Sequence, residues 1–289
     1  METKVGIIGL GIMGGAIAAN LLERGWSVGG YDVSAASMEA LKPLGLHAAG
    51  SVAELAADMP VLLMSLPNPQ AAHAVAAGIA ASGAPPRIVA EMSTLAIADK
   101  LALQAVLAGA GHTPLDCPLS GTGAQAKLRD LIVYASGDSG AIAGCQPLFA
   151  DFARQAPDLG VYGNGSRMKF IANLLVAIHN VAAAEAMRLA VEAGLDPERV
   201  VEVIGPGAGG SRMFQMRAPM MASGVYEPAT MRVAMWRKDM DIIAAFARDL
   251  NCPTPLFDLT APIYAKALEM GLGDQDTAAV FEVIKSLAR

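Results

Sequence analysis

Two patterns of hydrophobic residues divide the chain near residue 165. Before it, short runs rich in β-branched residues alternate with longer stretches rich in Ala and Leu. Strands separated by helices of this length are typical of right-handed βαβ units, so we expect an α/β domain built on a doubly wound parallel sheet. The runs predict strands at Lys4–Gly9, Ser27–Asp32, Val61–Ser65, Ile88–Met92, Thr113–Cys117 and Ile132–Ser136, and the stretches predict helices at Gly14–Arg24, Ala35–Leu41, Gln70–Ala81, Ala96–Ala108 and 123–130.

After Gly165 only helical patterns continue. The stretch Ser166–Gly194 is rich in Ala, Leu and Met, with a serine suited to cap its start and a glycine suited to end it. Later helical segments are separated by prolines, and we expect no strand among them. The sequence therefore predicts an α/β domain at 1–164 and an all-helical domain at 165–289, joined by a long helix at 165–194.

Composition narrows the class of protein. Hydrophobic residues make up 54% of the 289 residues and charged residues 17%, which excludes a disordered chain. The mean hydropathy is +0.42, yet the charge-free stretch Phe170–Ala184 has only 15 residues, and a membrane span needs about 20. A net charge of −6 argues against a nucleic-acid partner. We expect a soluble, cytoplasmic protein, not bound to membranes, whose three Cys and four His lack the spacing of a metal site.

A glycine-rich segment follows the first predicted strand and opens the first predicted helix. It reads Gly9, Leu10, Gly11, Ile12, Met13 and Gly14, the spacing that lets a backbone approach a pyrophosphate at a helix N-terminus. Asp32 ends the next strand, where a carboxylate binds the ribose hydroxyls of NAD and repels the 2′-phosphate of NADP. The sequence therefore predicts NAD as cofactor, with NADP disfavoured. A glycine-rich turn followed by an ordinary helix-capping Asp is the alternative.

Three further segments place polar groups on otherwise apolar elements: Asp116–Thr122, Gly163–Asn173 and Trp236–Asp241. In the second, Lys169 and Asn173 lie four residues apart and thus on one helix face. Burial of Lys169 would lower its pKa toward the range useful for general acid–base catalysis. Two alternatives remain. In one, Lys169 is a surface lysine with only its alkyl chain covered, and in the other, Lys238-Asp239 is a solvated charged face.

Together these segments resemble the signatures of the β-hydroxyacid dehydrogenase family, which includes 3-hydroxyisobutyrate dehydrogenase, tartronate semialdehyde reductase and the glyoxylate/succinic semialdehyde reductases. GLGIMG at 9–14 matches the cofactor loop of the family, and DCPLSG at 116–121 resembles its substrate loop. GNGSRMKFIAN at 163–173 matches its catalytic motif, and KD at 238–239 matches its C-terminal motif. The resemblance covers nearly the whole chain. It implies a Rossmann-type domain followed by a helical domain like that of 6-phosphogluconate dehydrogenase.

The resemblance also implies a role for each matched residue. Lys169 would be the general acid in reduction and the general base in oxidation, as a hydride moves between NAD and a small β-hydroxyacid or its semialdehyde. The substrate, a small carboxylate, would be held by Ser120, Gly121, Thr122 and Asn173, and Asp239 would position the lysine. The cofactor would contact the glycine loop 9–14, Asp32, Leu66, Pro67, Thr94 and Lys238.

Two departures from the family pattern leave the substrate open. Thr122 stands where the family has a second glycine, and Met231 stands where it commonly has Phe. Two other functions also remain: an NAD(P)H oxidoreductase of the imine reductase kind, and a non-catalytic dinucleotide-binding module that acts through assembly. The long apolar helix and the helical domain predict a homodimer or homotetramer.

Overall fold

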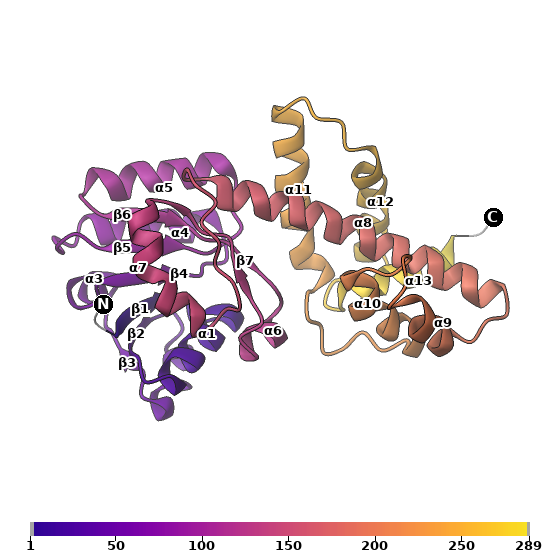
Figure 1. Cartoon of the computed structure of the whole chain (residues 1–289), viewed down its shortest axis with the longest axis horizontal. Coiled ribbons are helices and arrows are strands. Elements are labelled where there is room, and N and C mark those ends of the chain that lie inside the picture. The colour runs from indigo at the N-terminus through magenta and orange to yellow at the C-terminus, as the bar shows by residue number, and fades with distance from the viewer. Residues whose placement is uncertain (1–2, 288–289) are drawn as a thin grey trace. The chain divides into compact units, whose positions relative to one another are not determined.

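The computed structural model describes residues 3–287, and the chain forms two compact units, Met1–Lys169 and Phe170–Arg289 (Figure 1). The boundary between them falls inside one continuous helix, α8 (Asn164–Glu192). The first turns of α8 therefore belong to the first unit and the rest of it to the second. Each unit has its own core and is described separately.

The first unit is built on a seven-stranded sheet in the order β3-β2-β1-β4-β5-β6-β9. Neighbouring strands from β3 to β6 are parallel, and only β9 is antiparallel to its neighbour. This is the order of a doubly wound dinucleotide-binding sheet, which confirms the predicted fold. The strands are β1 (Lys4–Ile8), β2 (Ser27–Tyr31), β3 (His47–Ala48), β4 (Val61–Met64), β5 (Ile88–Glu91), β6 (Thr113–Asp116) and β9 (Ser136–Gly137), with a separate antiparallel pair of β7 (Leu119–Ser120) and β8 (Ile132–Val133).

Helices cover both faces of this sheet (Figure 1). On one face, α1 (Ile12–Glu23) and α7 (Ser139–Ala150) pack in a cluster with Val5 and Ile7 of β1. On the other face, α3 (Val52–Asp58), α4 (Pro69–Ala80) and α5 (Ile97–Gly109) pack in a second cluster with Ile8. Successive side chains of a strand point to opposite faces of the sheet. When both faces are buried, the sequence of each strand is therefore a nearly continuous run of apolar residues. The remaining helices of the unit are α2 (Ala35–Glu39), the 3-10 turn η1 (Lys42–Leu44) and α6 (Gly123–Lys127).

The second unit consists of helices around the remainder of α8. They are α9 (Pro197–Ile204), α10 (Arg212–Ser223), α11 (Val233–Asp249), α12 (Pro255–Glu269), the 3-10 turn η2 (Thr277–Ala279) and α13 (Val280–Ser286). No strand is assigned after Gly137 within residues 3–287, so the predicted all-helical character is confirmed for this range. Its core holds a buried ion pair between Arg217 and Asp276, with nitrogen and oxygen 2.8 Å apart. Phe170 and Phe246 pack edge to face with ring centroids 5.2 Å apart.

By length and composition alone, α8 is apolar enough to cross a membrane, since its hydropathy over the most apolar window is 1.5. The central helix of a soluble protein passes the same test. Of that window, 44% is buried within the protein. Asn180 lies in the middle of α8, and its side-chain amide donates hydrogen bonds to the Tyr264 hydroxyl and the Thr277 carbonyl. Such buried polar pairing fits a helix packed against protein.

The structure corrects two predicted element boundaries. The strand predicted at Ile132–Ser136 is two short strands, β8 and β9, in different sheets. The chain leaves the sheet between them because the N–H of Val133 donates to Gln155 and that of Tyr134 to Pro118. The long helix begins at Asn164 and ends at Glu192, so Ser166 is not its N-cap. Instead, the backbone N–H and hydroxyl of Ser166 both donate to the Asp116 carboxylate.

Candidate active site

The carboxyl ends of the central strands bring the predicted cofactor residues to one edge of the sheet. Asp32 follows β2, Gly9 follows β1, Leu66 lies two residues after β4, and Thr94 lies three residues after β5. These strands are neighbours in that order, so the four residues follow one another along the edge. From β1 the chain adds β2 and β3 on one side of the sheet and then adds β4 on the other side of β1, so the strand order switches between β1 and β4. This is where doubly wound folds bind their ligands.

The glycine loop has the close backbone packing that its sequence predicts. Gly9 has a φ of +89°, and a Cβ on it would lie 2.1 Å from the Ser65 carbonyl oxygen. A Cβ on Gly14 would lie 1.9 Å from the Gly9 carbonyl oxygen, so both positions require glycine. By contrast, a Cβ on Gly11 would meet no atom within 4 Å. Gly11 is the N-cap of α1 and has no side chain to cap the helix, so no N-cap side chain occupies the first N–H groups of α1.

Asp32 is held in place by the glycine loop itself. Its Oδ2 accepts the N–H of Leu10 at 2.7 Å, and its Oδ1 accepts the N–H of Ser34 at 2.7 Å. Each oxygen retains a lone pair for a ribose hydroxyl. Val33 is 94% exposed and offers no cation to a 2′-phosphate. A cavity of about 540 Å³ adjoins the loop and is lined in part by Leu10, Gly11 and Ile12. These residues fit a dinucleotide.

The predicted substrate loop lies just beyond β6. Ser120 ends the short strand β7, and Thr122 is the N-cap of α6. Thr122 and Gln125 form a capping box, in which the N–H of Thr122 donates to the Gln125 Oε1 at 3.0 Å. The threonine that replaces the family glycine is therefore engaged in capping a helix. Ser120 and Gly121 are not used in this way.

The predicted catalytic lysine is buried near the start of α8. Lys169 is 9% exposed, and Asn173 lies one turn later on the same face of the helix. Within the second unit, the Asn173 Nδ2 donates to the Asp239 Oδ2 at 3.0 Å, and both side chains are buried. The Lys238 Nζ lies 3.4 Å from the Asp239 Oδ1. The structure thus brings Asn173, Lys238 and Asp239 together, and it places Lys169 on the helix that carries Asn173.

Sequence reasoning missed two buried charges in the first unit, Lys100 and Glu91. Lys100 is fully buried and pairs with the carboxylates of Glu91 and Asp116. A signal for Lys100 was available: it falls three residues before Leu103 and seven before Leu107, on the buried face of α5. For Glu91 we find no such signal. An acidic residue is common where a strand ends and its chain returns to solvent, so the sequence does not distinguish a buried Glu91 from an exposed one.

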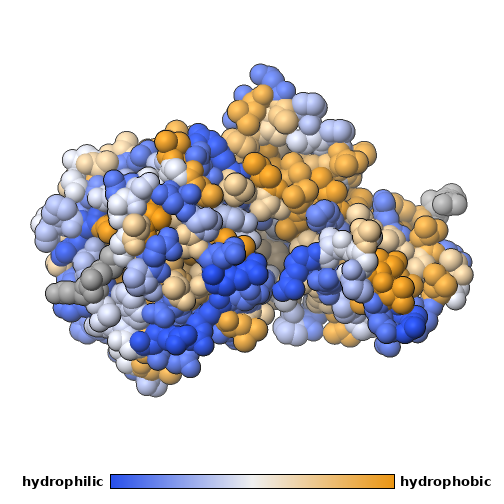
Figure 2. Space-filling view, in the orientation of Figure 1, coloured by the Kyte–Doolittle hydropathy of each residue, from blue (hydrophilic) through white to orange (hydrophobic). Residues whose placement is uncertain are grey.

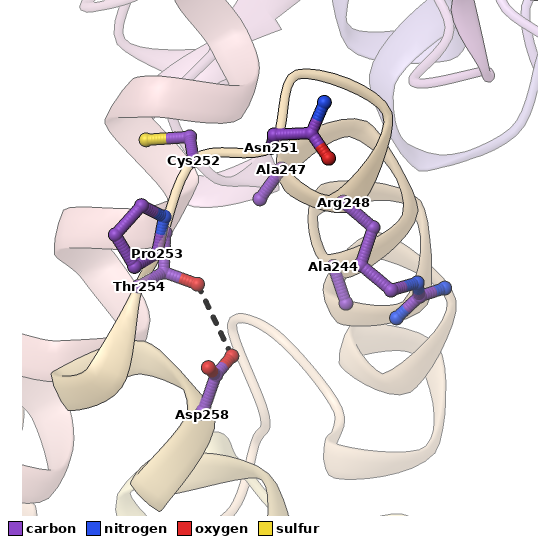
Figure 3. Close-up of a pocket in the computed structure, with 8 residues that line it drawn as sticks. All are labelled: Ala244, Ala247, Arg248, Asn251, Cys252, Pro253, Thr254 and Asp258. Atoms are coloured by element: carbon purple, nitrogen blue, oxygen red, sulfur yellow. Dashed lines mark hydrogen bonds between the residues drawn. The ribbon is translucent and has the colours of Figure 1, made fainter.

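Other features of the structure lie away from these residues. An open cavity of about 850 Å³ lies at the turn between α11 and α12, and it contains none of the predicted site residues (Figure 3). In it, the Thr254 hydroxyl donates to Asp258 at 3.1 Å (Figure 3). All three cysteines are free. Within residues 3–287, no group of three or more His, Cys, Asp and Glu side chains is placed to hold a metal ion.

Comparison with known proteins gives the family. Residues 4–163 match the family model of the NAD binding domain of 6-phosphogluconate dehydrogenase. Residues 163–284 match that of the NAD-binding domain of NADP-dependent 3-hydroxyisobutyrate dehydrogenase. L-threonate dehydrogenase of Cupriavidus necator is 33% identical over 99% of this chain and 98% of its own. The chain belongs to the β-hydroxyacid dehydrogenase family. It is therefore an NAD(P)-dependent hydroxyacid dehydrogenase or semialdehyde reductase.

Solved structures of this β-hydroxyacid dehydrogenase family share the fold over nearly the whole chain. The crystal structure of 3-hydroxyisobutyrate dehydrogenase from Salmonella typhimurium is 31% identical with a TM-score of 0.86, covering 97% of this chain and 99% of its own. The 3-hydroxyisobutyrate dehydrogenase of Mycobacterium tuberculosis with L-serine is 25% identical with a TM-score of 0.90, covering 99% of this chain and 100% of its own. The family resemblance seen in the sequence is confirmed.

Replacing single glycines tests the cofactor loop. We expect Gly11→Ala to keep its stability but to bind NAD at least about 10-fold more weakly, because the added methyl enters only the space left for phosphate. Gly14→Ala should lose both stability and binding, since its Cβ would collide with the Gly9 carbonyl. Thermal unfolding and calorimetric titration with NAD measure both quantities.

The matched control is Gly109→Ala, because a Cβ there would also meet nothing within 4 Å but lies at the far end of α5. It should leave NAD affinity unchanged and should not lower the melting temperature, since alanine is the better helix former. Wild-type affinity in Gly11→Ala would contradict a phosphate at the start of α1.

Proposed function

We propose that this enzyme transfers a hydride between NAD and a small β-hydroxyacid or its semialdehyde, with Lys169 as general acid and base. One observation supports the role of Lys169 most directly. The lysine is buried near the start of α8, and one turn later the same helix carries Asn173, whose amide is fixed by the buried Asp239. A buried ammonium beside a positioned amide is suited to donate a proton to a developing alkoxide.

The loop 9–14, Asp32, Leu66, Pro67, Thr94 and Lys238 would hold the dinucleotide. When bound, NADH supplies the hydride for reduction and NAD accepts it in oxidation. The residues of this chain then donate or accept the proton that accompanies the hydride. In reduction the Lys169 ammonium donates a proton to the carbonyl oxygen of the substrate, and in oxidation the neutral amine takes the proton from the hydroxyl.

The proposed substrate class follows from the polar groups of the predicted substrate loop and of Asn173. The Ser120 hydroxyl and the N–H of Gly121 would donate to the substrate carboxylate, a role for which Thr122 is less suited because its N–H already donates to Gln125. The Asn173 Nδ2 donates to Asp239, so its Oδ1 would accept from a substrate hydroxyl or from the Lys169 ammonium. Such donors select a short, anionic hydroxyacid. A panel with L-threonate, 3-hydroxyisobutyrate and short semialdehydes would identify it.

Replacing the lysine tests the mechanism. We expect Lys169→Met to lower kcat by about 1,000-fold or more with little change in NAD affinity, because the proton transfer is lost while the dinucleotide site is intact. Absorbance of NADH at steady state and calorimetric titration measure the two quantities.

The control is Lys266→Met, which removes an exposed lysine paired only with Glu269 and should keep wild-type rates. Full activity in Lys169→Met would refute the proposed mechanism. Reduction of cyclic imines without turnover of any hydroxyacid or semialdehyde would favour an imine reductase. Tight NAD binding without any turnover would favour a binding module.

The preference for NAD rests on Asp32. We expect wild-type enzyme to favour NAD over NADP, and we expect Asp32→Gly combined with Val33→Arg to reverse the preference by about 100-fold in kcat/KM. The reason is that the double variant replaces a carboxylate that repels the 2′-phosphate with an exposed guanidinium that binds it. The single variant Val33→Arg, which keeps Asp32, is the control and should shift the preference far less. Equal use of both cofactors by wild-type enzyme would contradict the assignment.

We also propose that the enzyme is a cytoplasmic homodimer or homotetramer that associates through its helical unit. Exposed apolar side chains recur along one face of α8, at Ile171, Leu175 and Leu189, and others lie on α12, at Leu256 and Leu259. Figure 2 shows apolar side chains gathered over the helical unit. A soluble monomer rarely exposes a large contiguous apolar patch, so a second copy of the chain is a suitable occupant.

Sedimentation tests this association. Wild-type enzyme should sediment as a dimer or tetramer at micromolar concentration, and Leu189→Glu with Leu259→Glu should shift it to monomer because a charge would be buried without a partner. Leu44→Glu, at an exposed leucine of the first unit, should leave the assembly intact. A wild-type monomer would refute the proposal.

A further inference from the structure

Two acidic residues lie side by side at the buried carboxyl edge of the sheet. Glu91 ends β5 and Asp116 ends β6, and the two are direct partners in the register of these parallel strands. Adjacent strands are about 4.8 Å apart, and paired residues point to the same face. Both side chains are at most 1% exposed. Two carboxylates so placed repel each other strongly, and water does not screen them.

Lys100 places one cation against both carboxylates. It lies in α5, the helix that connects β5 to β6, and its side chain is fully buried. Its Nζ lies 2.9 Å from the Asp116 Oδ1 and also pairs with Glu91. Burial by itself would lower the pKa of Lys100, but the charges of Asp116 and Glu91 outweigh burial and raise the pKa well above its ordinary value. The lysine is therefore charged throughout the working range of pH.

Asp116 uses its carboxylate to hold the first turn of α8. Its Oδ2 accepts the backbone N–H of Ser166 at 2.7 Å, and its Oδ1 accepts the Ser166 hydroxyl at 2.8 Å. The hydroxyl of Ser136 donates to the Asp116 carbonyl oxygen at 3.2 Å and accepts the N–H of Gly165 at 2.9 Å. Ser166 lies three residues before Lys169. Asp116 thus holds the helix turn that leads to the lysine.

Glu91 connects the same lysine to the cofactor loop. Its Oε1 accepts the backbone N–H of Ser93 at 2.9 Å, and the Ser93 hydroxyl accepts the N–H of Leu66 at 2.8 Å. Leu66 is one of the residues assigned to the cofactor. Lys100 is therefore the central group of an unbroken path of polar contacts, which runs from the loop after β4 to the start of α8.

The other titratable groups near this cluster carry no charge at neutral pH. Burial raises the pKa of the Tyr162 hydroxyl well above its ordinary value, although the Lys100 charge opposes that change. Burial also raises the pKa of the Cys117 thiol, and it raises that of the Cys145 thiol to about 11. The cluster therefore holds one positive and two negative side chains, and within residues 3–287 Lys100 is the cation that acts on both Tyr162 and Cys117.

We propose that Lys100 is a positioning residue for the dehydrogenase reaction: it pairs with Asp116 and Glu91 at once and thereby holds the first turn of α8, and Lys169 with it, at a fixed place relative to the cofactor loop. This inference rests on the proposed role of Lys169. It assigns Lys100 no contact with substrate or cofactor.

The test replaces the cation and then restores the charge balance. Lys100→Met leaves two carboxylates without a cation, so one of them takes up a proton and the contacts to Ser166 weaken. We expect kcat to fall about 100-fold with KM changed less than about threefold, because the lysine is misplaced while the binding groups remain. The acidic limb of the kcat–pH profile should move to higher pH by about one unit or more, because the enzyme now requires that carboxyl to be deprotonated.

A second substitution separates charge from packing. Glu91→Gln keeps an oxygen for the Ser93 N–H but removes one negative charge, so Lys100→Met with Glu91→Gln has the same net charge in the cluster as the wild type. We expect this double variant to recover at least about 10-fold in kcat over Lys100→Met and to return the acidic limb toward the wild-type position. No recovery in the folded double variant would overturn the proposal.

Two controls separate the inference from loss of stability and from the proposed function. Leu103→Ala removes a buried apolar side chain from the same helix and leaves the three charges of the cluster in place, and it should lower the melting temperature with kcat and the pH profile unchanged. If Lys100→Met behaves like Leu103→Ala, the inference fails. If Lys169→Met is fully active, the proposed function fails instead.

Hydrogen exchange gives a readout that needs no activity. In Lys100→Met, the amide hydrogens of residues 165–169 should exchange at least about 10-fold faster than in the wild type, because the acceptor for the Ser166 N–H is weakened. In Leu103→Ala this segment should keep its protection relative to the rest of the protein. If Lys100→Met does not fold, Ser166→Ala tests the same link, and wild-type kcat and exchange in that variant would overturn the proposal.

Discussion

The parallel register of the sheet in the first unit is the constraint on which the rest of the site depends. Because β2, β1, β4, β5 and β6 pair in parallel and in that order, their carboxyl ends meet at one edge. A residue that follows one strand is thereby brought next to residues 30 or more positions away in sequence, as Gly9 is to Ser65. That contact leaves no room for a side chain, which is why the loop is built from glycine.

The same register has an electrostatic cost. It places the carboxylates of Glu91 and Asp116 side by side in the interior, where two charges about 5 Å apart repel by about 3 kcal/mol at an effective dielectric constant of about 20. Burying even one unpaired charge is more costly still, so a neutralising partner is needed. Lys100 meets this need from the crossover helix between the two strands. A fully buried lysine is thus a consequence of how the strands align.

The helical unit also contains a buried carboxylate that is neutralised by a buried cation. Asp276 is fully buried and accepts the N–H groups of Thr230 and Met231, at 2.8 and 3.2 Å, while Arg217 neutralises it. These contacts fix the chain just before α11, the helix that carries Lys238 and Asp239. In each unit, then, a buried aspartate with its own cation holds the backbone that leads into a helix bearing site residues.

Local patterns predicted most of the architecture but not this pairing of charges. The runs that form β1, β2, β4, β5 and β6 were identifiable because strands buried on both faces consist mostly of apolar residues, and the glycine spacing at 9–14 depends on neighbours close in sequence. Strand β3 has two residues, α3 has seven, and α7 has only a weak apolar periodicity, so none was expected. Arg217 in α10 neutralises a buried aspartate. Its partner Asp276 lies 59 residues away, and only the fold brings them together.

Thr122 shows why the substrate is harder to predict than the reaction. The departure from the family glycine was visible in the sequence, but its consequence depends on Gln125, with which Thr122 forms a capping box, and on Asp130, which accepts the Gln125 amide at 3.1 Å. The side chain at this position thus fixes the start of α6, next to the predicted substrate loop. The reaction depends on a few groups whose identity the motif states. Substrate choice depends on how neighbouring backbone segments are anchored, and a motif does not record that.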